Sequence, residues 1–362
     1  MKFEIKTVTI LMYAALALAL GSCTKKTITP AEDPQPAEVG FTASSQAVWV
    51  KGETDPKTTF PYTNFGVWGI ARHQHVESPY ILWSTNQLTE VSAPEGTSTN
   101  QETSNVVFTP ATAAYWLGGY EYSFLAVAPY NAAGLSNVNF TLANTSGNTT
   151  GKDYMTFTYD MSGKYAAGNY TFDLLGAAAQ TPVTTGGYDE SQQLVFWHLL
   201  SQIEITNIGF ASGINGRVDK IVLRAFPSAV YTISHDNSSD NRTKPTGIAC
   251  DEITVKNDGE PADKSEITFT NPNFSVFHPI INIIPQAVAN LELYIDFTIT
   301  QDTITDEYKD FKINLNAQEL TEYVYNGKYN WNITIGTRNA ITFDVSVTPW
   351  QDAIVPGEYP LS

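Results

Sequence analysis

Three runs of the chain decide its fold: LELYIDFTIT (residues 291–300), YNWNITI (residues 329–335) and ITFDVSVT (residues 341–348). Apolar and polar residues mostly alternate in each run, which is the period of a β-strand that buries one face. Valine, isoleucine, threonine, tyrosine and phenylalanine dominate, and these residues fit a pleated, half-buried surface. The three runs therefore predict strands.

Turn residues separate these strands. Asn326-Gly327-Lys328 precedes the second run, and Gly336 to Asn339 separates it from the third. Similar apolar runs recur along the earlier chain, for example from Phe65 to Ala71 and from Tyr120 to Tyr130. Because these strands follow one another with no helical period between them, the sequence predicts antiparallel pairing in a sandwich or barrel. The predicted fold class is all-β.

The bulk composition excludes one class of partner. The chain has 362 residues, a formal net charge of -17 and a pI of about 4.6. Nucleic-acid binding needs clustered lysine and arginine, so we expect no nucleic-acid partner. Only 16% of the residues are charged, whereas threonine, asparagine and serine are abundant. Such a composition is typical of an extracellular β protein.

The first residues form an export signal. Its apolar core, Val8 to Leu20, is too short for a comfortable membrane span. The core ends in Leu20-Gly21-Ser22-Cys23, which is similar to a bacterial lipobox. We therefore predict a lipoprotein signal peptide at residues 1–22, with Cys23 as the lipidated first residue of a membrane-anchored mature chain. A plain secretory signal with an incidental cysteine is the alternative.

Changes in composition divide the mature chain. Residues 23–38 contain three prolines and mixed charge, which predicts a flexible tether. Residues 39–180 form a first strand-rich domain, and residues 193–362 form a second. Residues 181–192 between them contain Thr-Gly-Gly and predict a linker.

A series of short motifs runs nearly from end to end. They are Cys23, Phe41-Thr42-Ala43, Phe65-Gly66-Val67-Trp68, Tyr115-Trp116, Tyr122 to Ala126, Ala128-Pro129-Tyr130, Asp173 to Ala177, Phe196 to Ile203, Ile283 to Gln286, Gly327-Lys328-Tyr329 and a last strand ending at Trp350. In this order and spacing the chain resembles the fimbrillins of Bacteroidetes, the subunits of lipoprotein-derived type V pili. The resemblance implies two tandem transthyretin-like β-sandwich domains after the lipoprotein signal peptide.

The resemblance also implies a route of assembly. In the family, a lipidated precursor reaches the outer membrane and a protease removes the N-terminal segment with its first strand. A terminal strand of the next pilin subunit then fills the opened groove by donor-strand exchange. We expect the groove at the site vacated by Val39–Val50, and the donor in the tail from Thr348 to Ser362. Until export, the first strand would cover the groove and so protect an open sheet edge that would otherwise favour aggregation.

Processing departs from the family's pattern. The best-known members are cut after an arginine in the N-terminal region, whereas the first arginine after Cys23 here is Arg72, beyond the predicted Phe65–Ala71 strand. Lys51 and Lys57 are earlier basic positions, so these three residues are the candidate cleavage sites. Either a different protease cuts the chain, or the subunit stays uncut as a lipidated anchor at the pilus base.

Motifs for catalysis or cofactor binding are absent from the sequence. It has no glycine-rich phosphate loop, no Gly-x-Ser-x-Gly elbow and no His-Glu-x-x-His. His73 and His75 could share one face of a strand but lack a nearby third ligand, and Asp236 to Asp240 lacks the later residues of a calcium loop. His198 and Cys250 are expected to be packed residues. We therefore predict no metal, no cofactor and no enzyme, although the scattered carboxylates leave a glycosidase pair open.

The predicted function is that of a structural subunit of a surface fimbria that supports cell adhesion. Its expected partners are other pilin subunits, the outer membrane through lipid on Cys23, and a host or bacterial surface receptor. The alternative is a stand-alone or base-anchoring outer-membrane lipoprotein that binds glycan or a host protein. In that case Trp49, Trp68, Trp83 and Trp116 would line a sugar-binding face, whereas we expect them in the sandwich core.

Overall fold

The computed structural model describes residues 36–45, 60–73, 78–84, 87–97, 106–143, 152–181, 191–235, 247–253, 263–270, 274, 277–301, 303–315, 320–336 and 341–349. Contacts within the chain define two units, Met1–Pro36 and Ala37–Ser362, and all the strands belong to the second. The predicted signal peptide and Cys23 lie outside the described residues. None of the helices in the described ranges has the length and hydrophobicity of a membrane span.

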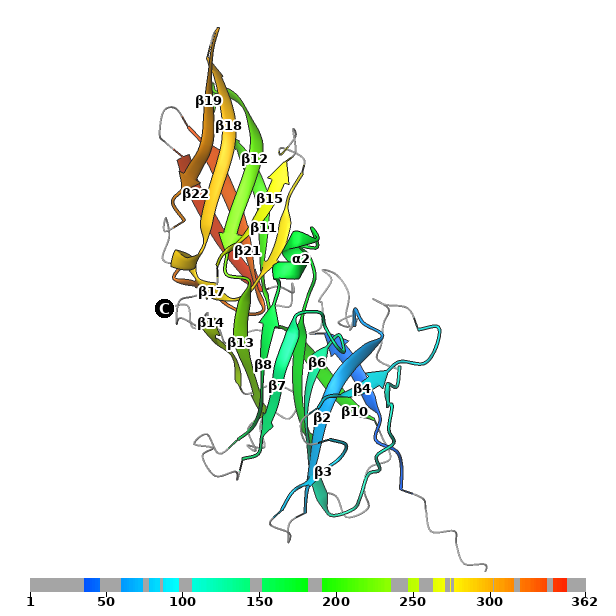
Figure 1. Ribbon diagram of the computed structural model, residues 1–362. Coiled ribbons are helices and arrows are strands. Elements are labelled where there is room, and N and C mark those ends of the chain that lie inside the picture. The colour runs from blue at the N-terminus through cyan, green and yellow to red at the C-terminus, as the bar shows by residue number, and fades with distance from the viewer. Residues whose placement is uncertain are drawn as a thin grey trace, which may run out of the picture. The chain divides into compact units, whose positions relative to one another are not determined.

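The described chain is built almost entirely of strands, which confirms the all-β fold class (Figure 1). The first nine strands are β1 (Phe41–Ser45), β2 (Asn64–His73), β3 (Tyr80–Ile81), β4 (Thr89–Ser92), β5 (Thr109–Pro110), β6 (Tyr120–Ala128), β7 (Leu135–Thr141), β8 (Asp153–Asp160) and β9 (Leu175–Thr181). They are followed by β10 (Gln192–His198), β11 (Ser201–Phe210), β12 (Asn215–Ala225), β13 (Ser228–His235), β14 (Gly247–Ile253), β15 (Ser265–Thr270) and β16 (Ile280–Ile283). The last are β17 (Gln286–Ala287), β18 (Glu292–Gln301), β19 (Ile304–Ile313), β20 (Glu322–Tyr323), β21 (Gly327–Ile335) and β22 (Ile341–Pro349). Two short helices, α2 (Ser162–Ala166) and η1 (Val288–Asn290), interrupt them.

The largest sheet has eight strands in the order β1-β10-β9-β6-β2-β4-β5, with β3 paired to β2. A four-stranded sheet, β14-β13-β8-β7, faces it, and β13 packs on β9 and β6. Strands β6 and β9 are buried on both faces, because Leu125 packs toward Phe157 and Tyr231 while Phe124 packs into a second cluster on the opposite face. This double burial explains why their sequences are continuously apolar instead of alternating.

Two further four-stranded sheets, β16-β11-β21-β22 and β15-β12-β18-β19, enclose the C-terminal core. Ile203, Trp331 and Ile333 from the first sheet share this core with Leu293 and Ile295 from the second. Burial alternates along β21 and β18, as the predicted one-sided strands require. A small sheet of β17 and β20 completes the described strands.

Consecutive strands pair antiparallel as predicted, for example β18 with β19 and β21 with β22, but two pairs of strands that are distant in the chain are parallel. Strand β1 runs parallel to β10, and β11 runs parallel to β21. Parallel partners need a long crossover, and many strands separate the members of each pair along the chain. The alternating pattern reports a strand's buried face but carries no information about the direction of its partner.

Sheet membership does not follow the order of the chain. Strand β10, which the sequence analysis assigned to the second domain, pairs with β9 and β1, and β13 pairs with β8. The apolar run that begins at Gln193 forms two strands, because β10 ends at His198 and β11 begins at Ser201. Residues 182–190 of the predicted linker lie outside the described part of the chain.

Asn282 on β16 fastens the connection between β8 and β9 to the C-terminal sheets. Its side-chain nitrogen donates to the carbonyls of Thr171 (3.2 Å) and Phe172 (3.0 Å), and its backbone nitrogen donates to the carbonyl of Tyr170 (2.7 Å). The Tyr165 hydroxyl on α2 donates to the Asn282 carbonyl at 3.1 Å. A buried polar side chain with its bonds satisfied in this way fixes the position of the segment that it holds.

Candidate functional site

Strand β1 has hydrogen-bonded neighbours on both of its edges. On one edge it pairs in parallel with β10, from Phe41 opposite Gln192 to Ser45 opposite Phe196. On the other edge the Phe41 nitrogen donates to the carbonyl of Phe108 at 2.9 Å, and the Phe108 nitrogen donates back at 2.7 Å. The Val39 nitrogen likewise donates to the carbonyl of Ala114 at 2.8 Å. We call the space that β1 occupies between β10 and residues 106–116 the β1 site.

Most of β1 is buried in the β1 site, since Phe41 is 0% exposed and Ala43, Ser44 and Ser45 are also buried. Val39, just before the strand, is 1% exposed, so this segment inserts a medium, a large and a small apolar side chain into the protein at Val39, Phe41 and Ala43. The Phe41 ring meets Phe124 edge-on at a centroid distance of 5.0 Å and Phe65 at 6.0 Å. Burying an aromatic side chain contributes several kcal/mol, so we expect Phe41 to be the main anchor of the strand.

The walls of the β1 site are mostly aromatic. Phe60, Phe65, Phe108 and Phe196 are fully buried and pack against one another, with Phe60 and Phe196 only 4.9 Å apart between ring centroids. Without β1, the rings that it covers would face water, and two rows of backbone groups would lose their partners. Both consequences favour another extended strand at this place.

Sequence reasoning found β1 but missed two residues that line its site. Phe60 stands between Thr59 and Pro61, and Phe108 ends the short apolar run Val106-Val107-Phe108, so neither belongs to a strand-length pattern. Their only signal was a large apolar side chain without alternation around it. Trp116, which the sequence did single out, is 2% exposed and packs on Tyr122 at 4.7 Å.

The candidate cleavage residues lie in different surroundings. Lys51 and Lys57 lie outside the described residues, between Ser45 of β1 and Phe60 along the sequence. Arg72 lies in β2, where it faces Glu121 of β6 in the ladder, and its guanidinium donates to Asp153 at 2.5 Å. The Asp153 carboxylate is buried, at 1% residue exposure. Arg72 is therefore a structural residue of a central strand, which is a poor substrate position for a protease.

The other residues singled out in the sequence do not converge on one site. His73 ends β2 and packs on Tyr120 at 4.9 Å, whereas His75 and residues 236–240 lie outside the described chain. Across the described ranges, no cluster of three or more metal-binding side chains occurs. Cys250 lies in β14, which pairs with β13.

His198 is buried, as predicted, and its Nδ1 lies 2.6 Å from an Asp173 carboxylate oxygen. The Tyr62 hydroxyl donates to the Asp173 carbonyl at 2.6 Å. Burial, together with the charge of Asp173, raises the pKa of Tyr62 and of Tyr159 far above the usual tyrosine range. Both phenols therefore stay neutral and serve packing.

Four of the seven tryptophans were considered for a sugar-binding face. Of these four, Trp68 and Trp116 are buried, which confirms the core prediction for these two. Trp68 stacks on Phe140 at 4.7 Å. Trp83 is half-buried against the β1 site, and its indole nitrogen donates to the carbonyl of Thr112 at 2.8 Å. Trp49 lies outside the described residues.

Several solved structures are similar to the chain. They include a fimbrial protein from Bacteroides vulgatus, with 15% identity over 87% of this chain and 99% of that chain and a TM-score of 0.49. A fimbrial assembly protein from Parabacteroides distasonis has 10% identity over 87% and 98%, with a TM-score of 0.40. The fimbrial anchor protein Mfa2 from Porphyromonas gingivalis has 11% identity over 87% and 98%, with a TM-score of 0.37. No curated protein matches the chain significantly.

A protein family also matches most of the chain. The sequence model described as fimbrillin-like matches residues 63–350, which extends from the start of β2 to just beyond the end of β22. This match confirms the resemblance that the order of motifs indicated. The chain belongs to the fimbrillin-like family.

Proposed function

We propose that this chain is a structural subunit of a surface fimbria and that it polymerises by replacement of β1. The observation that carries the proposal is the β1 site: one short strand, hydrogen-bonded on both edges, with Phe41 buried among aromatic rings. Membership of the fimbrillin-like family supports a fimbrial location at the cell surface and contact with other fimbrial subunits. It also supports a structural rather than an enzymatic role.

Removal of β1 would open the site for a strand from another subunit. Main-chain hydrogen bonds to β10 and to residues 106–116 would supply affinity, and the positions of Val39, Phe41 and Ala43 would select alternate side chains of the incoming strand. We propose cleavage between Ser45 and Phe60, after Lys51 or Lys57, because this frees β1 and leaves β2 intact. Cleavage at Arg72 would divide β2 itself.

Strand β22 is a suitable donor when it is taken together with the tail that follows it. Its sequence from Ile341 to Val347, ITFDVSV, repeats the order of Val39 to Ser45, VGFTASS, with phenylalanine third in both. Strand β22 ends its sheet, and its Thr342, Asp344, Ser346 and Val347 side chains are exposed. We propose that β22 and the tail from Thr348 to Ser362 donate to the β1 site of the next copy.

The remaining elements of the proposal concern the precursor and its domains. We propose that Cys23 is lipidated and tethers the precursor to the outer membrane through residues 24–38. We also propose two sandwiches made of interleaved segments, the first from the eight-stranded sheet with β14-β13-β8-β7 and the second from the sheets that contain β11 and β12. A subunit that keeps β1 would act as the anchor at the base of the fimbria.

The first experiment determines the N-terminus of the protein sheared from the cell surface, by mass spectrometry. A start after Lys51 or Lys57 is expected for a polymerising subunit. A start at acylated Cys23 would mean that β1 is retained, and the chain would then be a base anchor or a stand-alone lipoprotein. A start after Arg72 would contradict the proposed role of β2.

The second experiment tests the donor with purified chain cut between Ser45 and Phe60. Electron microscopy should show fibres from the cut wild type, and none from uncut protein. Phe343→Ala should abolish fibres, whereas Ser346→Ala, at an exposed position on the same strand, should leave them unchanged. Persistent monomer after complete cleavage of the wild type would contradict polymerisation. Normal fibres from Phe343→Ala would contradict the role of β22.

A further inference from the structure

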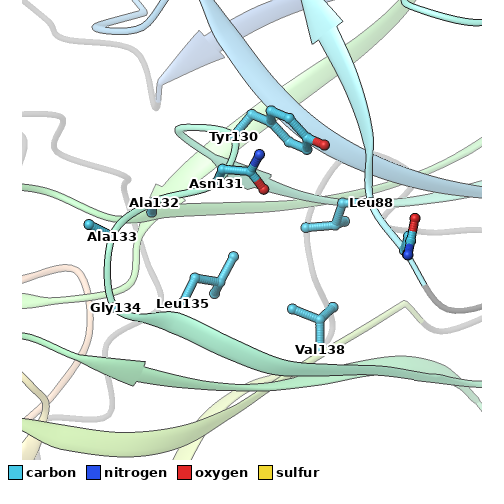
Figure 2. A pocket seen from close by; sticks show the side chains of 9 residues that line it. Leu88, Tyr130, Asn131, Ala132, Ala133, Gly134, Leu135 and Val138 are labelled. Atoms are coloured by element: carbon cyan, nitrogen blue, oxygen red, sulfur yellow. The ribbon is translucent and has the colours of Figure 1, made fainter.

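A cavity of about 570 Å³ lies between the loop after β6 and the edge strand β7 (Figure 2). Tyr130 and Asn131 border it on the loop side, Leu135 and Val138 border it on the β7 side, and Leu88 lies between them. Gln87 and the small residues Ala132, Ala133 and Gly134 complete the lining. We call this cavity the Tyr130 pocket. Its volume is within the range of small-molecule sites in proteins.

Two glycines allow close packing around the Tyr130 pocket. A Cβ atom on Gly66 of β2 would lie 2.9 Å from Cβ of Leu88 and 3.2 Å from the Tyr130 ring, so a glycine there lets both side chains lie against the strand. Gly134 has a φ of 101°, and a Cβ atom there would lie 2.0 Å from the carbonyl oxygen of Asp160. The loop that carries Tyr130 and Asn131 therefore has a fixed path.

Three uncharged polar groups belong to the lining of this space, the amides of Gln87 and Asn131 and the hydroxyl of Tyr130. Among the described residues, no side-chain hydrogen bond engages the amides of Gln87 and Asn131 or the hydroxyl of Tyr130. Gln87 and Asn131 are exposed, whereas Leu88, Tyr130, Leu135 and Val138 are half-buried. An amide supplies a donor and an acceptor side by side, which matches neighbouring hydroxyl groups of a ligand.

Among the described residues, the lining contains no aspartate, glutamate, lysine, arginine or histidine. A charged ligand would find no opposite charge there and would lose hydration without compensation. A ligand with hydroxyls on its rim and C–H groups on its faces would find the two amides at the rim, and the Tyr130 ring with Leu135 and Val138 as an apolar surface. We propose that the Tyr130 pocket binds a short neutral saccharide, which would make each subunit adhesive independently of strand replacement.

Saccharide binding is tested with the purified mature chain on an array of neutral mono- to trisaccharides, with sialylated and sulfated saccharides as the charged set. The wild type should retain neutral saccharides in preference to charged ones. The strongest neutral saccharide is then titrated by calorimetry. Asn131→Gly removes the amide yet keeps a residue suited to the φ of 52° at this position. It should weaken binding by roughly tenfold, as should Tyr130→Leu, which keeps apolar volume but removes the ring.

Tyr80→Leu is the matched control, because Tyr80 is 57% exposed and does not line the pocket. It should bind as the wild type does, and circular dichroism should show all three variants folded. If Tyr130→Leu does not fold, Asn131→Gly decides the result. Retention of no neutral saccharide, preference for the charged set, or wild-type affinity in Asn131→Gly would each overturn the proposal. Fibre formation by the same variants should be unchanged, so failure here leaves strand replacement untouched.

Discussion

The ring of Phe41 lies edge-on to the ring of Phe124, with centroids 5.0 Å apart, and joins the first strand of the protein to the centre of its largest sheet. The contact links β1 to β6, although the two strands are not hydrogen-bonded neighbours. The hold on β1 therefore depends on side-chain packing as well as on its ladder. The proposed replacement of β1 would therefore need an incoming strand that presents a similar ring.

Truncation of this ring should weaken the hold on β1. Phe41→Ala is expected to lower the free energy of unfolding of the uncut chain by about 3–5 kcal/mol, because it leaves a cavity in a fully buried aromatic cluster. Urea titration followed by tryptophan fluorescence measures the change. Ile304→Ala, at a residue that is 66% exposed, should change stability by less than about 0.5 kcal/mol. Equal effects of the two substitutions would contradict the anchoring role of Phe41.

Loss of the Asn282 side chain should loosen the connection between β8 and β9. Asn282→Ala removes the donor to the carbonyls of Thr171 and Phe172 and is expected to destabilise the protein by about 0.5–1.5 kcal/mol for each lost hydrogen bond. The rate of backbone amide hydrogen exchange should then increase more at residues 165–172 than in β21. Uniform acceleration across both regions would argue against a local fastening role.

Removal of Arg72 should leave the buried Asp153 carboxylate without its cation. Arg72→Met is expected to cost about 2–3 kcal/mol of stability, a value below that of a fully buried pair because the Arg72 side chain is 24% exposed. Combination with Asp153→Asn should recover part of the loss. A double-mutant cycle by urea denaturation measures the coupling free energy between Arg72 and Asp153. Additive effects of the two substitutions would show that the two side chains do not stabilise each other.

Alkaline pH should destabilise the fold. Burial raises the pKa of Tyr62, Tyr159 and Tyr165 above the value in the unfolded chain, which is about 10. Because the folded form holds these protons more tightly, the stabilisation is complete below pH ~10 and is lost as the pH rises further. The slope should be about 1.4 kcal/mol per pH unit for each phenol. Tyr159→Phe should reduce the slope, and an unchanged slope would show that this phenol does not contribute.

The sequence predicted those parts of the fold that depend on local pattern. The alternation around Trp331 and Ile333 identified β21 and its buried face correctly. The position of β10 beside β1 was not predictable, because Phe41 and Gln192 are distant in the chain and nothing in either run specifies its partner. The stacking of the sheets was also not predictable. A strand that is buried on both faces, such as β6, is continuously apolar and does not show which side chains face which sheet.

The candidate site was predicted in part for similar reasons. The motif Phe41-Thr42-Ala43 indicated the strand, and its resemblance to a family indicated why a first strand matters. Phe60 and Phe108 were missed because the apolar residues next to each are too few to show the periodicity of a strand. The Tyr130 pocket could not be predicted either, since its lining combines Leu88, just before β4, with Val138 of β7, which are distant in the chain.

The parallel pairing of β1 with β10 has a consequence for the timing of folding. Strands β2 to β9 are all synthesised and exported between the two partners, so the earliest strand of the fold is among the last to reach its place. A segment that docks late adds little to the folding transition state, and substitutions in it chiefly change the rate of unfolding. We therefore expect β1 to dock in a late folding step. Its proposed release would reverse that step and leave the other sheets folded.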